Sequence, residues 1–183
     1  MGGNGSGRHY HWDAKSTTTD YRRLDVRRWA RDGLLEPGNS FAWQWSRDGQ
    51  KVAGINVAID AKEVRLKYRL RDMGAEWEDI DCRVSLLTQP CNFGGNRTWF
   101  ACPAHGCGRR VAILYGGKIF ACHKCYQLAY PTQRMAAFER AANRASKIRN
   151  RLGWADGFLE GKKPKGMHWS TFRRLSNEID FWD

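Results

Sequence analysis

The sequence predicts an α+β fold in which an antiparallel β-meander is followed by a cysteine-bearing ribbon and by C-terminal helices. Between residues 40 and 87, apolar and polar residues alternate with a period of two, which is typical of half-buried strands. Four cysteines then follow in two closely spaced pairs. After Pro131 the composition shifts to Met, Ala, Arg and Asn, with no further strand pattern, which indicates helix.

These changes in pattern divide the chain into four segments. Residues 1–16 are rich in Gly and Ser and predict a flexible arm. Residues 17–96 predict a helix followed by an antiparallel sheet, residues 97–130 the ribbon, and residues 131–183 a pair of basic helices. With 183 residues, the chain has no room for two large domains.

The first helix is expected to begin after a cap at Ser16 or Asp20 and to run to Asp32, where Gly33 stops it. Its apolar residues, Leu24 and Trp29 among them, are expected to dock it on the rest of the protein.

The meander is expected to have about four strands, with hairpin turns at Asp48-Gly49 and at residues 60–62. Its third strand carries a basic row on the polar side: Arg65, Lys67, Arg69 and Arg71. A solvated strand face explains this row better than a binding face, although both readings remain open.

The four paired cysteines predict a zinc site. Cys102 and Cys107 enclose four residues, Cys122 and Cys125 enclose two, and fourteen residues separate the pairs. Each pair can turn two thiolates towards one ion, and the intervening residues suffice for a hairpin that brings the pairs together. Because four thiolates close the coordination shell, one structural Zn²⁺ per chain is expected. Residues 97–130 are therefore interpreted as a zinc ribbon.

Other readings of these cysteines remain. Two residues are usual between the first pair, so the longer gap leaves open that His105 replaces one cysteine as a ligand. A redox dithiol at Cys122 and Cys125 is less favoured, because such a motif normally opens a helix in a βαβ unit. The remaining thiols are expected to be a buried strand residue, Cys82, and a loop residue, Cys91.

Charge points to a polyanionic partner. The formal net charge is +12 and the isoelectric point is near 9.8. Residues 1–99 contain 16 basic and 13 acidic side chains, whereas residues 100–183 contain 15 and 6, so most of the excess lies on the ribbon and the helices. The expected phosphate contacts are Arg109, Arg110, Arg140, Arg144, Lys147 and Arg151.

The last four of these residues fall within about 60° on a helical wheel, with Phe138, Ala142 and Ala145 expected on the opposing, packed side. Such a stripe suits phosphates, because guanidinium groups fit phosphate oxygens. A solvated surface helix is the alternative. Trp99, Tyr115 and Tyr126 are candidates for stacking on unpaired bases.

Several functional classes find no support. No apolar run approaches the roughly 18 residues of a membrane helix, and no secretory leader pattern is present, so a cytoplasmic protein is expected. Familiar nucleotide-binding and hydrolase motifs are absent as well, and no catalytic residue can be named, although an enzyme is not excluded.

Three segments resemble a family of small uncharacterised bacterial and prophage-associated proteins: residues 91–103 (Cys-Asn-Phe-Gly-Gly-Asn-Arg-Thr-Trp-Phe-Ala-Cys-Pro), residues 107–115 and residues 120–130. Similar features lie at Gln133-Arg134, at the Gly-Ser-Gly-Arg start and around Leu24. The family usually has two residues within its first cysteine pair, where this chain has four. The resemblance implies a zinc ribbon in a mobile-element or bacterial setting and brings no established activity.

Two functional hypotheses follow. In the first, the protein is a zinc-ribbon nucleic-acid-binding protein, with DNA the favoured ligand and a role as a phage-associated regulator. In the second, it is an adaptor that docks its sheet and ribbon on a host or defence protein.

Overall fold

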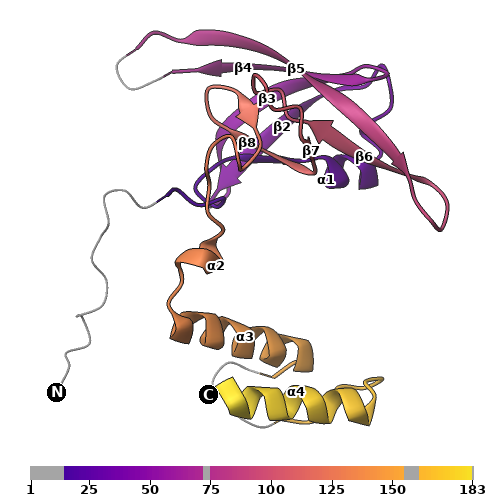
Figure 1. Cartoon of the computed structure of the whole chain (residues 1–183), viewed down its shortest axis with the longest axis vertical. Coiled ribbons are helices and arrows are strands. Elements are labelled where there is room, and N and C mark those ends of the chain that lie inside the picture. Colours follow the sequence, from indigo (N-terminus) through magenta and orange to yellow (C-terminus); the bar gives the residue numbers. More distant parts are fainter. Residues whose placement is uncertain (1–14, 72–74, 155–160, 183) are drawn as a thin grey trace. The chain divides into compact units, whose positions relative to one another are not determined.

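The structure, a computed structural model, describes residues 15–71, 75–154 and 161–182. It confirms an α+β fold with antiparallel sheets and separates the chain into two compact units, residues 1–130 and residues 131–183 (Figure 1). The predicted arm at residues 1–16 falls almost entirely outside the described residues.

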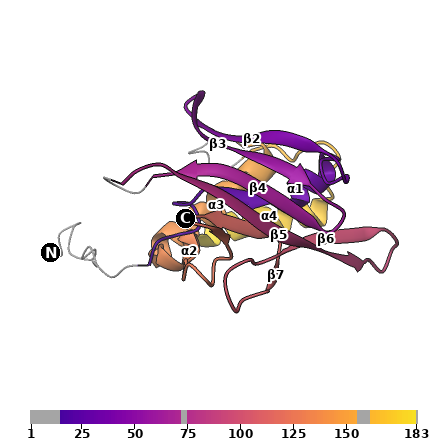
Figure 2. The ribbon, with the colours of Figure 1, turned by 90° about the horizontal axis from the view of Figure 1, so that it is seen from above.

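The larger sheet of the first unit has six strands in sequence order: β2 (Ser40–Arg47), β3 (Gln50–Ile59), β4 (Glu63–Leu70), β5 (Glu78–Pro90), β6 (Asn96–Ala101) and β7 (Arg110–Val111). All neighbouring strands pair antiparallel, and Figure 2 shows β2 to β6 following one another across the sheet. The predicted four-strand meander is therefore confirmed as β2 to β5. Its first turn is the expected two-residue one, with positive φ at Asp48 and Gly49.

A second sheet joins the start of the unit to the ribbon. It has the strand order β1 (Arg23–Asp25), β8 (Ile113–Gly116), β9 (Phe120–Ala121). The hairpin expected between the two cysteine pairs does not begin with one continuous strand, because the chain changes sheets at Ala112: β7 pairs with β6, and β8 pairs with β1 and β9. The carbonyl oxygen of Ala112 accepts a hydrogen bond from the amide of Val26 at 3.0 Å.

The first helix is shorter than predicted. The structure has strand β1 and then α1 (Val26–Arg31), where the sequence suggested one helix from Ser16 or Asp20. The prediction was wrong because Leu24 pairs with Leu114 and is fully buried, which fixes an extended backbone there. Asp25 caps the helix instead, accepting a hydrogen bond from the amide of Arg27 at 3.0 Å. The stop at Gly33 is confirmed by its φ of +68°.

The main core lies between the larger sheet, α1 and the smaller sheet. Trp29 of α1 is fully buried and makes edge-to-face contacts with Phe41, Trp43 and Phe100. The alternating side chains Ile55, Val57, Ile59, Val64, Leu66 and Val84 complete the apolar side of the sheet. The cysteines Cys102 and Cys122 belong to the same cluster, so the ribbon is continuous with this core.

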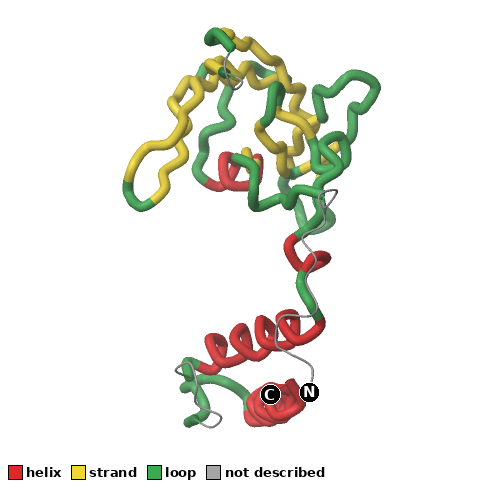
Figure 3. Tube along the Cα trace, turned by 90° about the vertical axis from the view of Figure 1, so that its left-hand side faces the viewer, coloured by secondary structure: helices red, strands yellow, loops and turns green. Residues whose placement is uncertain are grey.

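The described part of the second unit has three helices: α2 (Pro131–Arg134), α3 (Ala137–Leu152) and α4 (Trp169–Trp182). Figure 3 shows the helices in red. The helix expected after Pro131 breaks after Arg134. The chain becomes helical again in α3, where the Glu139 carboxylate accepts a hydrogen bond from the amide of Ala136 at 2.9 Å. Ile148 and Leu152 pack against Leu175 and Ile179 of α4.

Among the described residues, no helix combines the length and the apolar character that crossing a bilayer requires.

Candidate metal centre

The four paired cysteines meet at one point in the first unit. Cys102 follows strand β6 directly, and Cys122 follows strand β9 directly, so each sheet supplies one ligand at a strand end. Cys107 and Cys125 lie in the tight turns after them. The first turn is closed by a hydrogen bond from the Cys107 amide to the Ala104 carbonyl at 2.9 Å, and Gly106 and Gly108 have positive φ within and after it.

The four sulfur atoms have the spacing of a tetrahedral site. All lie within 4.8 Å of one another. The Sγ atoms of Cys102 and Cys125 are 3.8 Å apart, as are those of Cys107 and Cys122, and Cys122 and Cys125 are 3.5 Å apart. Metal–sulfur bonds of about 2.3 Å in a tetrahedron place sulfurs about 3.8 Å apart. The site therefore fits one metal ion, and all six cysteines of the chain are free thiols.

Two of the sulfur atoms accept hydrogen bonds from backbone amides, as thiolate ligands commonly do. The Cys122 amide donates to Cys102 Sγ at 3.2 Å, and the amide of Arg109 lowers the pKa of Cys107 to about 7. Burial raises the pKa of Cys102, and it also raises that of Cys125. Such N–H···S bonds stabilise a ligand in its deprotonated form.

The two histidines near the site are not part of the cluster. Among the described residues, the group that could hold a metal consists of the four cysteines alone. His105 lines the small hollow outside Cys107 and Cys125, and the His123 ring lies 5.5 Å from the ring of Tyr130. The longer first turn therefore still places the Cys107 sulfur in the cluster, and the geometry gives no support to replacement by His105.

The other two cysteines lie outside the cluster. Cys91 is exposed in the turn between β5 and β6, as expected, while Cys82 is half-buried on β5. Burial raises the pKa of the Cys82 thiol.

The two arginines next to the metal turns differ in their surroundings. Arg109 is exposed and lines the hollow beside Cys107. Arg110 lies over the ring of Trp99, with its guanidinium carbon 5.5 Å from the ring centroid, and Arg97 lies over the same ring at 5.1 Å. Trp99 is half-buried.

The other two candidates for base stacking are tyrosines. Tyr115 is buried, so the expectation that it stacks on a base was wrong. The ring of Tyr126 stacks on the ring of Tyr21.

The four basic residues expected to form a stripe on one helix all lie on α3 and are exposed: Arg140, Arg144, Lys147 and Arg151. Arg144 is paired with Glu178 of α4, and Arg140 donates to the carbonyl of Met135 at 2.6 Å. The packed side was predicted only in part. Ala145 is buried as expected, whereas Ala142 is exposed and Phe138 is 73% exposed.

The basic row of β4 divides into two parts that the sequence did not separate. Arg65 donates to the Asp81 carboxylate, with its closest contact at 2.6 Å. Lys67, Arg69 and Arg71 instead line a surface cavity of about 650 Å³ together with Arg22 and Lys51. Two signals in the sequence could have located this cavity: a glycine inside a strand, Gly54, and a tryptophan, Trp77, between acidic residues that follow the basic row.

Comparison of this chain with protein-family models, with curated proteins and with solved structures finds no match.

Proposed function

We propose that this chain is a nucleic-acid-binding protein whose ribbon holds one structural Zn²⁺ ion through Cys102, Cys107, Cys122 and Cys125. Four thiolates select zinc among the common divalent ions and leave no coordination position for a substrate. The ion would therefore supply folding energy, because it ties the end of β6 to the end of β9, and it would take no direct part in binding.

The observation that carries the binding proposal is the exposed basic face of α3. Arg140, Arg144, Lys147 and Arg151 are all exposed, and residues 131–183 contain 11 basic and 6 acidic side chains. Among the described residues, neither Lys147 nor Arg151 belongs to an ion pair, whereas Arg144 is paired with Glu178. Unneutralised cations spaced along a helix attract phosphates and release their counterions. In the first unit, Arg109 is exposed beside the metal turn and would be a separate phosphate contact.

DNA is the first ligand to test. In the bacterial or prophage setting that the family resemblance implies, such a protein would act as a regulator. The experiment is a salt titration of binding by purified, zinc-loaded protein to labelled duplex DNA, single-stranded DNA and RNA. We expect affinity to fall by about 10³-fold or more between about 50 and 200 mM salt if six or more phosphates are contacted. Affinity that does not change with salt would contradict the proposal.

A second candidate function, a protein-interaction adaptor, has one specific observation in its favour. Phe93 is fully exposed at the tip of the hairpin between β5 and β6, which extends away from the rest of its sheet in Figure 1. An exposed aromatic ring on a projecting hairpin suits a protein partner. Recovery of a stoichiometric protein partner after nuclease treatment, and its loss in Phe93→Ser, would favour this function over nucleic-acid binding.

A further inference from the structure

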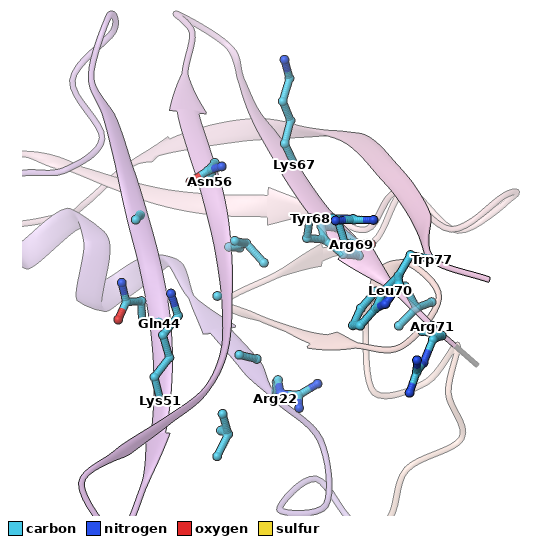
Figure 4. Close-up of a pocket in the computed structure, with 15 residues that line it drawn as sticks. Arg22, Gln44, Lys51, Asn56, Lys67, Tyr68, Arg69, Leu70, Arg71 and Trp77 are labelled. Atoms are coloured by element: carbon cyan, nitrogen blue, oxygen red, sulfur yellow. The ribbon is translucent and has the colours of Figure 1, made fainter. Parts of the chain in front are cut away.

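The larger sheet is split between two of its strands. Strands β3 and β4 pair only from Asn56 with Lys67 to Ile59 with Val64. Residues 50–55 of β3 pair with β2 alone, and residues 68–70 of β4 pair with β5 alone. The cavity of about 650 Å³ lies in this opening, with β2 and β3 on one side and β4 on the other (Figure 4).

Five cationic side chains surround the opening, and no Asp or Glu belongs to the described residues that line it: the cations are Arg22, Lys51, Lys67, Arg69 and Arg71. They come from three separate parts of the chain, so the sequence pattern of β4 alone did not show them as one group. Two carboxylates lie near these cations: Asp79, which is 3.4 Å from Arg69 and 84% exposed, and Asp81, the cross-strand neighbour of Lys67, which is already paired with Arg65. Such a weakly compensated group of cations concentrates a positive field in a hollow and attracts anions.

An exposed indole lies at the rim of the same opening. Trp77 is 53% exposed, and the guanidinium carbons of Arg69 and Arg71 lie 5.5 and 5.2 Å from its ring. Figure 4 shows Trp77 beside Leu70 and Arg71, on the β4 side of the cavity. An aromatic ring among arginines is the arrangement on which an unpaired base stacks while the cations hold its flanking phosphates.

The floor of the opening is apolar and aromatic. A smaller adjoining pocket shares Gly54, Ile55 and Tyr68 with the cavity and continues inward to Trp45 and Phe120. Gly54 has no side chain to fill the gap, and a Cβ there would lie 3.2 Å from the Lys51 side chain. The opening therefore offers cations for phosphates at its rim and, next to Trp77, additional apolar surface for a base.

We propose that the split between β3 and β4 binds an unpaired segment of nucleic acid, with a base on Trp77 and phosphates on the five surrounding cations. This inference rests on the proposed function and narrows its ligand to a single strand. A duplex stacks its bases on one another and offers no base face to an indole, whereas a single strand offers every base. An acidic peptide added to the unpaired strand edges is the competing occupant.

The test is fluorescence anisotropy on the full-length, zinc-loaded protein with a single-stranded oligonucleotide of about 12 nucleotides and with the corresponding duplex. Trp77→Ala removes the stacking surface, and Lys67→Ala removes one cation from the rim. Their matched controls are Trp169→Ala, an indole 60% exposed on α4, and Lys62→Ala, an exposed lysine in the turn before β4. Unchanged thermal melting confirms that each variant folds.

We expect Trp77→Ala to weaken single-strand binding by about tenfold and Lys67→Ala by a few fold, while both controls stay within about twofold of the parent protein. If Trp77→Ala binds as well as Trp169→Ala while the salt-dependent affinity of the parent protein persists, the split is not the site and only this inference fails. If the parent protein binds no nucleic acid, the proposed function fails as well. A polyglutamate peptide that displaces the oligonucleotide and itself requires Trp77 would overturn the inference in favour of a peptide.

Discussion

The backbone amide of Cys122 donates a hydrogen bond to the Sγ atom of Cys102 across 3.2 Å. This contact joins the end of β9 in the smaller sheet to the end of β6 in the larger one, twenty residues away in the sequence. Because the backbone of Cys122 positions the sulfur of Cys102, we expect the two sheets and the cysteine cluster to fold cooperatively.

Loss of a ligand should therefore destabilise the whole first unit. We expect Cys102→Ser to lower the metal content from about one zinc per chain to a small fraction, because the remaining thiolates no longer close a tetrahedron. The melting temperature should fall at the same time, since the Cys102 side chain also belongs to the core. Metal analysis and thermal unfolding measure both effects.

The control for this variant is Cys91→Ser, which replaces an exposed thiol outside the cluster and should leave the zinc content and the melting temperature unchanged. Treatment of the parent protein with a strong chelator should reproduce the effect of Cys102→Ser. Parent protein that contains no zinc after purification and reconstitution would contradict the metal assignment.

The helix cap at Asp25 is a second point where sequence and tertiary structure meet. Asp25 accepts from the amide of Arg27, and it also pairs with the Arg27 side chain, which lowers the pKa of its carboxyl group. Asp25→Ala should reduce the free energy of unfolding by about 1 kcal/mol. Asp25→Asn keeps a cap acceptor and should cost less.

Urea unfolding measures these differences. Asp32→Ala, which removes only an exposed pair with Arg28, serves as the control and should cost no more than about 0.5 kcal/mol. Equal losses for Asp25→Ala and Asp32→Ala would show that the cap contributes nothing.

Reversing charge on α3 should reduce binding by an electrostatic route. The double variant Lys147→Glu with Arg151→Glu should weaken nucleic-acid binding and lower the slope of log affinity against log salt by about 2, one phosphate contact for each residue. Arg144→Ala should have a smaller effect, because this side chain is already paired with Glu178. The measurement is the salt titration of each variant; an unchanged slope for the double variant would remove α3 from the interface.

Tyr68 should make the first unit sensitive to alkali. Burial raises the pKa of its phenol above the ordinary value of 10.0, so the folded state keeps this proton at a pH where the unfolded chain loses it. Stability from this group is present below about pH 10 and is lost as the pH rises further. The hydroxyl group also donates to the Lys118 carbonyl at 3.0 Å, which links β4 to the turn between β8 and β9.

Tyr68→Phe should therefore cost about 1 kcal/mol at neutral pH, through the lost hydrogen bond, and should then lose less stability than the parent protein between pH 9 and about pH 11. Denaturant unfolding at a series of pH values measures both effects. The same pH dependence in both proteins would show that the Tyr68 proton is not retained by folding.

The local patterns of the sequence located most of the elements. The alternation of Phe41, Trp43 and Trp45 predicted β2 correctly, and the Asp48-Gly49 turn predicted the hairpin that follows, because both signals depend only on neighbouring residues. The first helix was placed too early, since the extended backbone at Leu24 is imposed by β8, ninety residues away. No local signal encodes that pairing.

The sequence by itself determined the four-cysteine cluster, the meander and the positive charge, since each of these depends on residue type and short spacing. Only the tertiary structure decided that the ribbon strand divides between two sheets at Ala112. It alone decided, too, that the basic row of β4 separates, with Arg65 paired to Asp81 and Lys67 facing a cavity shared with Arg22 and Lys51. These outcomes arise from contacts between distant segments, and a periodicity along one strand carries no information about what lies across the sheet.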